Sequence, residues 1–154
     1  PTPPSPYVLQ TQHLFDIIEV LEKNSLSVVP VLNSDQQYEG VITNRKLLYT
    51  IAHSAAIQSI GGVIVLEMNN NDYSLTEISS IIESNNYKIL SSYVTSTPDS
   101  TKMELTMKVN KSDISRIIND LDRHGYVVTA SYKEDESQID FLERYEQLMK
   151  FLNP

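Results

Sequence analysis

The 154-residue chain contains no cysteine and no tryptophan, and it has only four glycines and 12 basic side chains against 20 acidic ones. Without cysteine there is no disulfide, no thiolate metal ligand and no cysteine nucleophile, which suits a reducing compartment. The glycines are Gly40, Gly61, Gly62 and Gly125, and this spacing forms no phosphate-binding loop, GxGxxG turn or GxSxG turn. No apolar run approaches the roughly 20 residues of a membrane span, and the start lacks the features of a signal peptide. We therefore expect a cytoplasmic, non-catalytic protein without a cofactor or metal.

The net charge of −8 is unevenly distributed. Residues 1–60 hold five acidic and three basic side chains (−2), residues 61–133 nine and seven (−2), and residues 134–154 six and two (−4). No segment combines clustered lysine and arginine with aromatic residues, as nucleic-acid binding requires. We expect neither a nucleic-acid nor a membrane partner.

The remaining candidates for catalysis are weak. His13, His53 and His124 stand far apart, each on a predicted helix with no second ligand at metal-binding spacing, so we expect partly exposed helix residues. Asp120 and Asp122 lie two residues apart on a predicted helix, do not face each other, and are expected to be solvated. A catalytic site assembled from distant positions is the alternative that a single sequence leaves open.

Hydrophobic spacing in the first third predicts an extended segment, a helix, two strands and a second helix. The first helix starts after Thr11 and ends near Asn24, with an apolar face formed by Leu14, Ile17, Ile18 and Leu21. Residues 27–32 and 38–43 flank a polar turn and predict a hairpin. Asn44 is expected to cap the second helix, residues 45–56, whose apolar side holds Leu47, Leu48 and Ile51. So small a unit buries little surface, and we expect a partner to cover its apolar face.

Beyond Gly61-Gly62 the pattern becomes β-α-β-β-α-β, the order of a ferredoxin-like fold. Strands are expected at residues 63–68, 88–94, 103–109 and 126–132, with a turn at Pro98-Asp99. The first helix opens with a capping box at Ser74 and Glu77, and its inward residues are Leu75, Ile78, Ile81 and Ile82. The second is capped by Asn110 or Ser112, ends at Gly125, and buries Ile114, Ile117, Ile118 and Leu121.

The predicted fold class is α+β in three segments: residues 1–60, residues 61–133 and an acidic helix in residues 134–154. The last helix spans residues 136–152 and carries an apolar stripe of Leu142, Tyr145, Met149 and Leu152. Such a stripe must dock either on the protein's own sheet or on a second subunit.

Three short motifs stand out in residues 7–56: Ser27-Val28-Val29-Pro30-Val31-Leu32, Gly40-Val41-Ile42-Thr43 and Leu47-Leu48. They resemble the second strand, third strand and closing helix of CBS repeats. In that family two repeats pack as a Bateman module that binds adenine nucleotides or related adenosyl ligands. The resemblance implies a second repeat upstream, and the missing initiator methionine and proline-rich opening suggest that Pro1 is not the natural start. The implied nucleotide-binding residues are Val28, Val29, Pro30, Thr43, Arg45 and Lys46.

One position departs from the pattern of that family. CBS repeats commonly place a carboxylate three residues after the Thr or Ser of the third strand, where it accepts hydrogen bonds from both ribose hydroxyls. This chain has Lys46 there, and an ammonium group cannot accept from a diol. Arg45 and Lys46 are candidates for a phosphate contact instead. The alternative is that both are solvated residues of the helix's first turn.

Residues 61–133 resemble ACT domains by topology, and the whole layout resembles bacterial CBS-plus-ACT proteins related to acetoin-utilisation regulators. In ACT domains a glycine in the first strand-to-helix loop lets the backbone approach an amino-acid effector. Here Tyr73 stands near that position, and its side chain would crowd the ligand. The implied effector-binding residues are Asn70, Asn71, Asp72, Tyr73 and Ser74, and the alternative is a polar loop followed by a helix cap.

Together these patterns predict a non-catalytic regulatory module that binds an adenine nucleotide or another small effector and forms a homo-oligomer, a dimer or larger. The alternative is an oligomerisation scaffold with no retained ligand site. Thermal stabilisation by a nucleotide would favour the first over the second.

Overall fold

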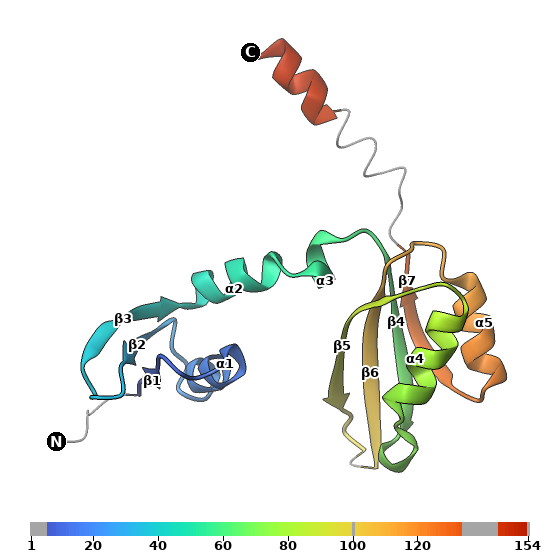
Figure 1. Ribbon diagram of the computed structural model, residues 1–154, viewed down its shortest axis with the longest axis horizontal. Coiled ribbons are helices and arrows are strands. Elements are labelled where there is room, and N and C mark those ends of the chain that lie inside the picture. The colour runs from blue at the N-terminus through green and yellow to red at the C-terminus, as the bar shows by residue number, and fades with distance from the viewer. Residues whose placement is uncertain (1–5, 100, 134–144, 154) are drawn as a thin grey trace. The chain divides into compact units, whose positions relative to one another are not determined.

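The computed structural model describes residues 6–99, 101–133 and 145–153 (Figure 1). The chain divides into two units, Pro1–Ile57 and Gln58–Pro154, and each has its own sheet and its own hydrophobic core. The predicted α+β class is confirmed. Among the described residues, no helix is long and apolar enough to cross a membrane.

The first unit is a three-stranded sheet with helices, in the order that the sequence predicts. Its elements are β1 (Val8–Leu9), α1 (Leu14–Lys23), β2 (Val28–Leu32), β3 (Tyr38–Thr43), α2 (Asn44–Ala52) and α3 (Ala55–Gln58), the last of which ends one residue past this unit. The strand order is β1-β2-β3, with β1 parallel and β3 antiparallel to β2. The core joins strand and helix residues: Val8, Ile17, Leu21, Val29, Val31 and Leu47.

Helix α1 begins at a histidine cap rather than after Thr11. The Nδ1 atom of His13 accepts a hydrogen bond from the Phe15 amide at 3.2 Å, and the Asp16 carboxylate accepts one from the His13 amide at 3.0 Å. His13 is therefore exposed, as expected, but it caps the helix instead of lying within it. Ile18 was expected inward but is 38% exposed, because only Ile17 and Leu21 turn fully towards the sheet.

Helix α2 differs from its prediction at both ends. Thr43, not Asn44, is the N-cap, since its hydroxyl accepts from the Lys46 amide while Asn44 is already helical. The helix stops at Ala52, with His53 as C-cap, instead of continuing to residue 56. Of its predicted apolar side only Leu47 is buried, and Leu48 is 66% exposed.

The second unit is a four-stranded antiparallel sheet with ferredoxin-like topology. Its elements are β4 (Gly62–Asn69), η1 (Asn70–Asp72), α4 (Leu75–Ser84), β5 (Ile89–Ser96), β6 (Lys102–Val109), α5 (Ser115–Arg123) and β7 (Val127–Tyr132). The strand order is β5-β6-β4-β7, and every neighbouring pair is antiparallel. Figure 1 shows α4 and α5 together on one face of this sheet.

Alternation along the central strands creates the core of this unit. Every second residue of β4 and β6 is buried, and these side chains meet the apolar faces of the two helices. Ile78, Ile81 and Ile82 point inward as predicted, but Leu75 is 40% exposed because it is the first residue of α4 and precedes the buried face. Gly125 ends the α5 segment with φ +84°, a conformation that favours glycine.

Neither residue predicted to cap α5 does so. Asn110 instead accepts a hydrogen bond from the Lys88 amide at 2.8 Å, and the Ser112 hydroxyl is buried without a partner among the described residues. The Asp113 carboxylate accepts from the Ser115 amide at 3.2 Å and so stabilises the start of the helix. Asp120 was expected to be solvated, but its carboxylate accepts from the buried Asn85 amide at 2.8 Å.

The C-terminal helix is described over residues 145–152. Leu142, the first residue of the predicted apolar stripe, lies outside the described residues. The other stripe residues are exposed: Tyr145 53%, Met149 39% and Leu152 61%.

Candidate ligand-binding sites

The first candidate site lies where β3 passes into α2. Thr43 is the last residue of β3, and its Oγ1 atom accepts a hydrogen bond from the Lys46 amide at 3.1 Å. This bond fixes the first turn of α2, which carries Arg45 and Lys46. A cavity of about 320 Å³ is lined by Thr43, Arg45, Lys46 and Tyr49. Its size is at the lower limit of small-molecule sites.

The electrostatics of this cavity favour an anion. The first turn of α2 has two cationic side chains and no acidic one, although the positive end of the helix dipole disfavours cations there. Neither Arg45 nor Lys46 forms an ion pair with another described residue. The Lys46 Nζ atom lies 5.0 Å from the centroid of the Tyr49 ring, within the range of a cation–π interaction. An anionic group bound in this cavity would neutralise both side chains and the helix terminus.

The predicted residues of β2 are brought only partly to this site. Val28 pairs with Thr43 across the hairpin, so its backbone lies beside the cap of α2, and its side chain is 43% exposed. Val29 is fully buried in the core, and Pro30 pairs with Val41 further from the cavity. The backbone of β2 therefore follows one side of the site, while the cavity itself is formed by Thr43 and the start of α2.

Tyr49 is a residue of this cavity that the sequence reasoning missed. It lies three residues after Lys46, so the two side chains share a face of the helix, and this spacing was the available signal. The ring of His53 packs against Tyr49 with centroids 4.1 Å apart, and its Nδ1 atom lies 2.8 Å from the Tyr49 carbonyl oxygen. His53 thus lies at the end of α2, and it is not paired with a carboxylate of any described residue.

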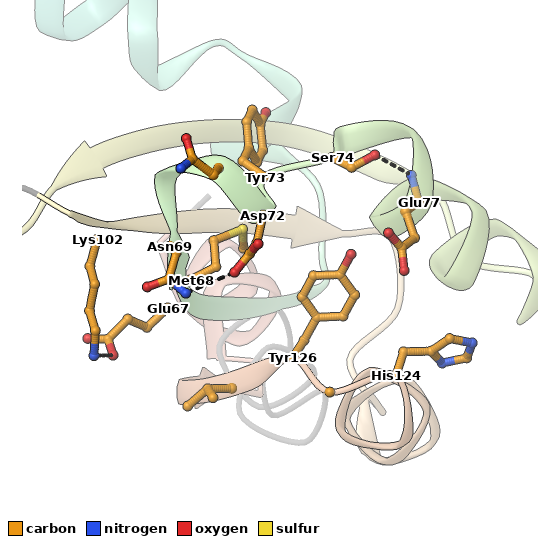
Figure 2. Close-up of a pocket in the computed structure, with 13 residues that line it drawn as sticks. Glu67, Met68, Asn69, Asp72, Tyr73, Ser74, Glu77, Lys102, His124 and Tyr126 are labelled. Atoms are coloured by element: carbon orange, nitrogen blue, oxygen red, sulfur yellow. Dashed lines mark hydrogen bonds and ion pairs between the residues drawn. The ribbon is translucent and has the colours of Figure 1, made fainter.

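The second candidate site is a cavity of about 610 Å³ in the ferredoxin-like unit (Figure 2). It is formed by the end of β4, the η1 turn, the start of α4, the start of β6 and the turn from α5 to β7. Its lining residues are Glu67, Met68, Asn69, Asn71, Asp72, Tyr73, Ser74, Glu77, Lys102, His124, Gly125, Tyr126 and Val127. The volume is within the usual range for small-molecule sites.

Hydrogen bonds hold most polar groups of this cavity in place. Lys102 donates to Glu67 at 3.0 Å, and Asn69 donates to Asp72 at 2.9 Å. The bond with Glu67 raises the pKa of Lys102 above its ordinary value. Ser74 Oγ accepts from the Glu77 amide at 3.3 Å, which is half of the predicted capping box.

Tyr126 is the buried aromatic residue of this cavity, with 9% of its surface exposed. Figure 2 shows its ring between Asp72 and Glu77. Burial raises the pKa of the Tyr126 hydroxyl, and its hydrogen bond to the Glu77 carboxylate and the negative charges of Glu77 and Asp72 raise it further. Each of these effects favours the protonated hydroxyl.

Four of the five predicted effector residues line this cavity: Asn71, Asp72, Tyr73 and Ser74. Asn70 is not among the lining residues, and its backbone amide donates to the Thr101 carbonyl at 2.9 Å. The sequence reasoning missed Glu77, Lys102, His124 and Tyr126, which reach the cavity from later elements. Only Glu77 carried a local signal, through its position in the capping box.

The described residues offer no support for a metal centre, since no three histidine or carboxylate side chains among them form a group that could hold a metal ion. The three histidines are at helix ends: His13 caps α1, while His53 and His124 are the C-caps of α2 and α5.

Comparison with known families detects a CBS domain at residues 1–53, a range that ends one residue after α2. CBS domains generally serve regulatory ligand binding, and proteins that contain them are typically not catalytic. No curated protein matches the chain. The resemblance of residues 61–133 to ACT domains, and of the whole chain to acetoin-utilisation regulators, has no support beyond topology and stays a prediction.

Proposed function

We propose that the chain is a non-catalytic regulatory module whose CBS domain binds an adenine nucleotide through a phosphate group at the start of α2. The observation that carries this proposal is the position of Arg45 and Lys46, two cations that line one cavity with the Thr43 hydroxyl. Neither has a carboxylate partner among the described residues. A phosphate supplies the missing negative charge, and Arg45 and Lys46 then donate charge-assisted hydrogen bonds to it.

The arrangement implies a phosphate-dependent ligand preference. Lys46 offers only donors, so a free ribose diol gains little at this position, whereas each phosphate oxygen accepts. By the CBS resemblance, the β2 backbone at residues 28–30 would lie at the adenine end and Thr43 at the phosphate end. We therefore expect ATP and AMP to bind more tightly than adenosine.

The affinity of this chain alone is expected to be weak. The cavity is small, and in CBS proteins a second repeat completes the nucleotide site. We expect isothermal titration calorimetry to find AMP and ATP binding that is weaker than low micromolar. Low-micromolar binding of either nucleotide would show that a single repeat suffices and would contradict this part of the proposal.

Matched variants test the site itself. Arg45→Ser and Lys46→Ser each remove one charge from the cavity, and nuclear magnetic resonance titration with ATP should show reduced shift changes at residues 43–49. Arg116→Ser is the control, because Arg116 also lies in the first turn of a helix but belongs to the other unit. Equal ATP affinity in all three variants would refute nucleotide binding at α2.

For the second unit, we propose that the cavity beside residues 70–74 accommodates a small effector. It is larger than the first cavity and lined by polar groups from five elements. Tyr73, which is 37% exposed, occupies the place where an ACT-like loop would have glycine. A thermal-shift screen of amino acids, compared between the parent chain and Tyr73→Gly, tests this. If an amino acid raises the melting temperature of the parent chain and of Tyr73→Gly by the same amount, its binding site lies elsewhere.

The second candidate function is an assembly scaffold, and exposed apolar side chains in the first unit favour it. Ile18, Leu48 and Ile51 are 38%, 66% and 37% exposed, although the sequence pattern puts all three on apolar helix faces. Soluble monomers seldom expose large contiguous apolar patches, so packing against another copy would bury them. A monomeric mass by light scattering at micromolar concentration would reject this function.

A further inference from the structure

The C-terminal helix, residues 145–152, has a row of exposed apolar side chains along one face. Tyr145, Leu148, Met149 and Leu152 follow the i, i+3, i+4, i+7 spacing of one helix face. Their exposed fractions are 53%, 53%, 39% and 61%. An apolar face of a helix is stabilised when it packs against another apolar surface.

The sheet of the second unit has a face that α4 and α5 do not cover. Ile64 and Leu66 of β4 are fully buried on the helix side, so Val63 and Val65 point to the opposite side. The strand register extends this face across the sheet. Val65 of β4 pairs with Thr106 of β6, and Thr106 pairs with Tyr93 of β5, while Val63 pairs with Tyr132 of β7 on the other side. We call the side chains of Val63, Val65, Tyr93, Thr106 and Tyr132 the open face.

The open face is apolar enough to receive a helix. Tyr93 and Tyr132 are 59% and 63% exposed, and Val63 and Val65 are partly exposed. Among the charged residues of the same side, Glu67 pairs with Lys102 at the other end, and Lys108 of β6 lies opposite Val63 at the near end. Val63, Val65 and Tyr132 therefore form an apolar area next to the point where β7 ends.

We propose that residues 145–152 of this chain dock on the open face of the same chain, with the stripe of Tyr145, Leu148, Met149 and Leu152 against it. Strand β7 ends at Tyr132, which is itself part of that face. Residues 133–144 connect Tyr132 to the helix and span at most roughly 40 Å, whereas a four-stranded sheet is about 15 Å wide between its outer strands. The helix thus reaches every part of the open face.

Tethering favours this occupant over the same helix of a second copy. Covalent connection over 12 residues makes docking on the same chain intramolecular, with an effective concentration on the order of millimolar, which exceeds the concentration of free copies in dilute solution. The polar residues of the helix, Glu146 and Lys150, lie off the stripe and remain in water. Docking therefore covers both exposed apolar surfaces, with Lys108 at the β6 side of the docked helix.

Paramagnetic relaxation in the intact chain tests the proposal. Gln147→Cys adds the sole cysteine to the chain, off the apolar stripe, and receives a nitroxide label. We expect loss of amide signal at residues 63–65 and 106, while the amide of Glu83 on the outer part of α4 keeps its intensity. Adding Leu148→Asp, which places a carboxylate in the stripe, should restore the lost signals.

Each outcome decides the proposal. Signal loss at the open face that Leu148→Asp reverses supports it, whereas loss that survives this substitution refutes apolar docking. Uniformly weak effects on all amides mean that the helix does not dock, which overturns the proposal. A sample mixing unlabelled ¹⁵N chain with spin-labelled ¹⁴N chain detects the rival: signal loss there assigns the helix to a second copy and also overturns it. None of these results depends on nucleotide binding at α2.

Discussion

The glycine pair at the start of β4, Gly61 and Gly62, allows a sharp test of how the second unit is built. A Cβ atom on Gly61 would lie 1.8 Å from the Val109 carbonyl oxygen and 3.0 Å from its carbonyl carbon. Even a close carbon–oxygen contact is roughly 3.3 Å, so Gly61→Ala must push two backbone segments apart by about 1.5 Å. This happens where Gly62 pairs with Val109 at the end of the β4–β6 ladder. We expect a loss of about 3 kcal/mol or more in the free energy of unfolding of this unit.

The neighbouring substitution should behave differently. A Cβ atom on Gly62 would lie 2.5 Å from Cγ2 and 3.2 Å from Cδ1 of Ile114, which is a side-chain rather than a backbone contact. Because Ile114 is fully buried, Gly62→Ala should cost about 1–3 kcal/mol by overpacking. Ile114→Ala removes the obstructing atoms, so the double variant should be more stable than the sum of the single effects by about 1 kcal/mol.

Urea unfolding followed by the amide signals of residues 62–132 measures these effects for the second unit alone. Ile114→Ala should give no comparable rescue of Gly61→Ala, because the clash there is with a carbonyl group that no side-chain change removes. A cost below about 1 kcal/mol for Gly61→Ala, or equal rescue of both alanine variants by Ile114→Ala, would refute this account of the β4–β6 approach.

Three further predictions concern buried polar groups and the exposed helix face of the first unit. The pKa of Tyr126 is raised in the folded state, which therefore binds the phenol proton more tightly than the unfolded state does. The stability that this proton contributes is complete below the ordinary pKa of 10.0 and is lost as the pH rises through the pKa of the folded state. Glu77→Gln should lower the pKa of Tyr126, which is measured by following phenolate absorbance as the pH is raised. If the tyrosine that ionises at the highest pH does so at the same pH in this variant, Glu77 is not a cause of the raised pKa. Asn85→Ala removes bonds to the Ile81 carbonyl and to Asp120 and should cost about 2–4 kcal/mol, whereas a thermal midpoint equal to that of the parent would show that this pair contributes nothing. Leu48→Asp should lower the mass seen by light scattering if the α2 face mediates assembly, and an unchanged oligomer would place the contact elsewhere.

The sequence was most informative where a local pattern has one structural solution. Alternation from Met103 to Val109 predicted a half-buried strand, because successive side chains of a strand point to opposite faces, and β6 has that burial pattern. The polar turn at residues 33–37 between two apolar runs predicted the β2–β3 hairpin. The order of strands and helices after Gly62 likewise predicted the ferredoxin-like topology.

Helix boundaries and caps were less predictable, because several side chains compete for the same role. Asn110 was a reasonable cap for α5 by residue type, but tertiary structure brings the Lys88 amide to it across 22 residues. The N-cap position is held by Ile114, and the Asp113 carboxylate before it accepts from the Ser115 amide. Similarly, Asp120 was expected to be solvated because it and Asp122 do not face each other on the helix, whereas its carboxylate accepts hydrogen bonds from Arg123 of the same helix and from Asn85, the C-cap of α4. Sequence separation hides such bonds.

The composition and hydrophobic periodicity of the chain by themselves determined its α+β class and its strand order along the chain, since these depend on local spacing, whereas the CBS-like character of its first part was inferred from the resemblance of three short motifs to a known family. Tertiary structure alone decided which side chains share a cavity. Tyr126 and Lys102 meet the loop of residues 70–74 because the sheet places β7 and β6 on either side of β4. Strand pairing and packing over the whole unit decide which residues of different strands lie side by side, and no short-range pattern in the sequence predicts these contacts.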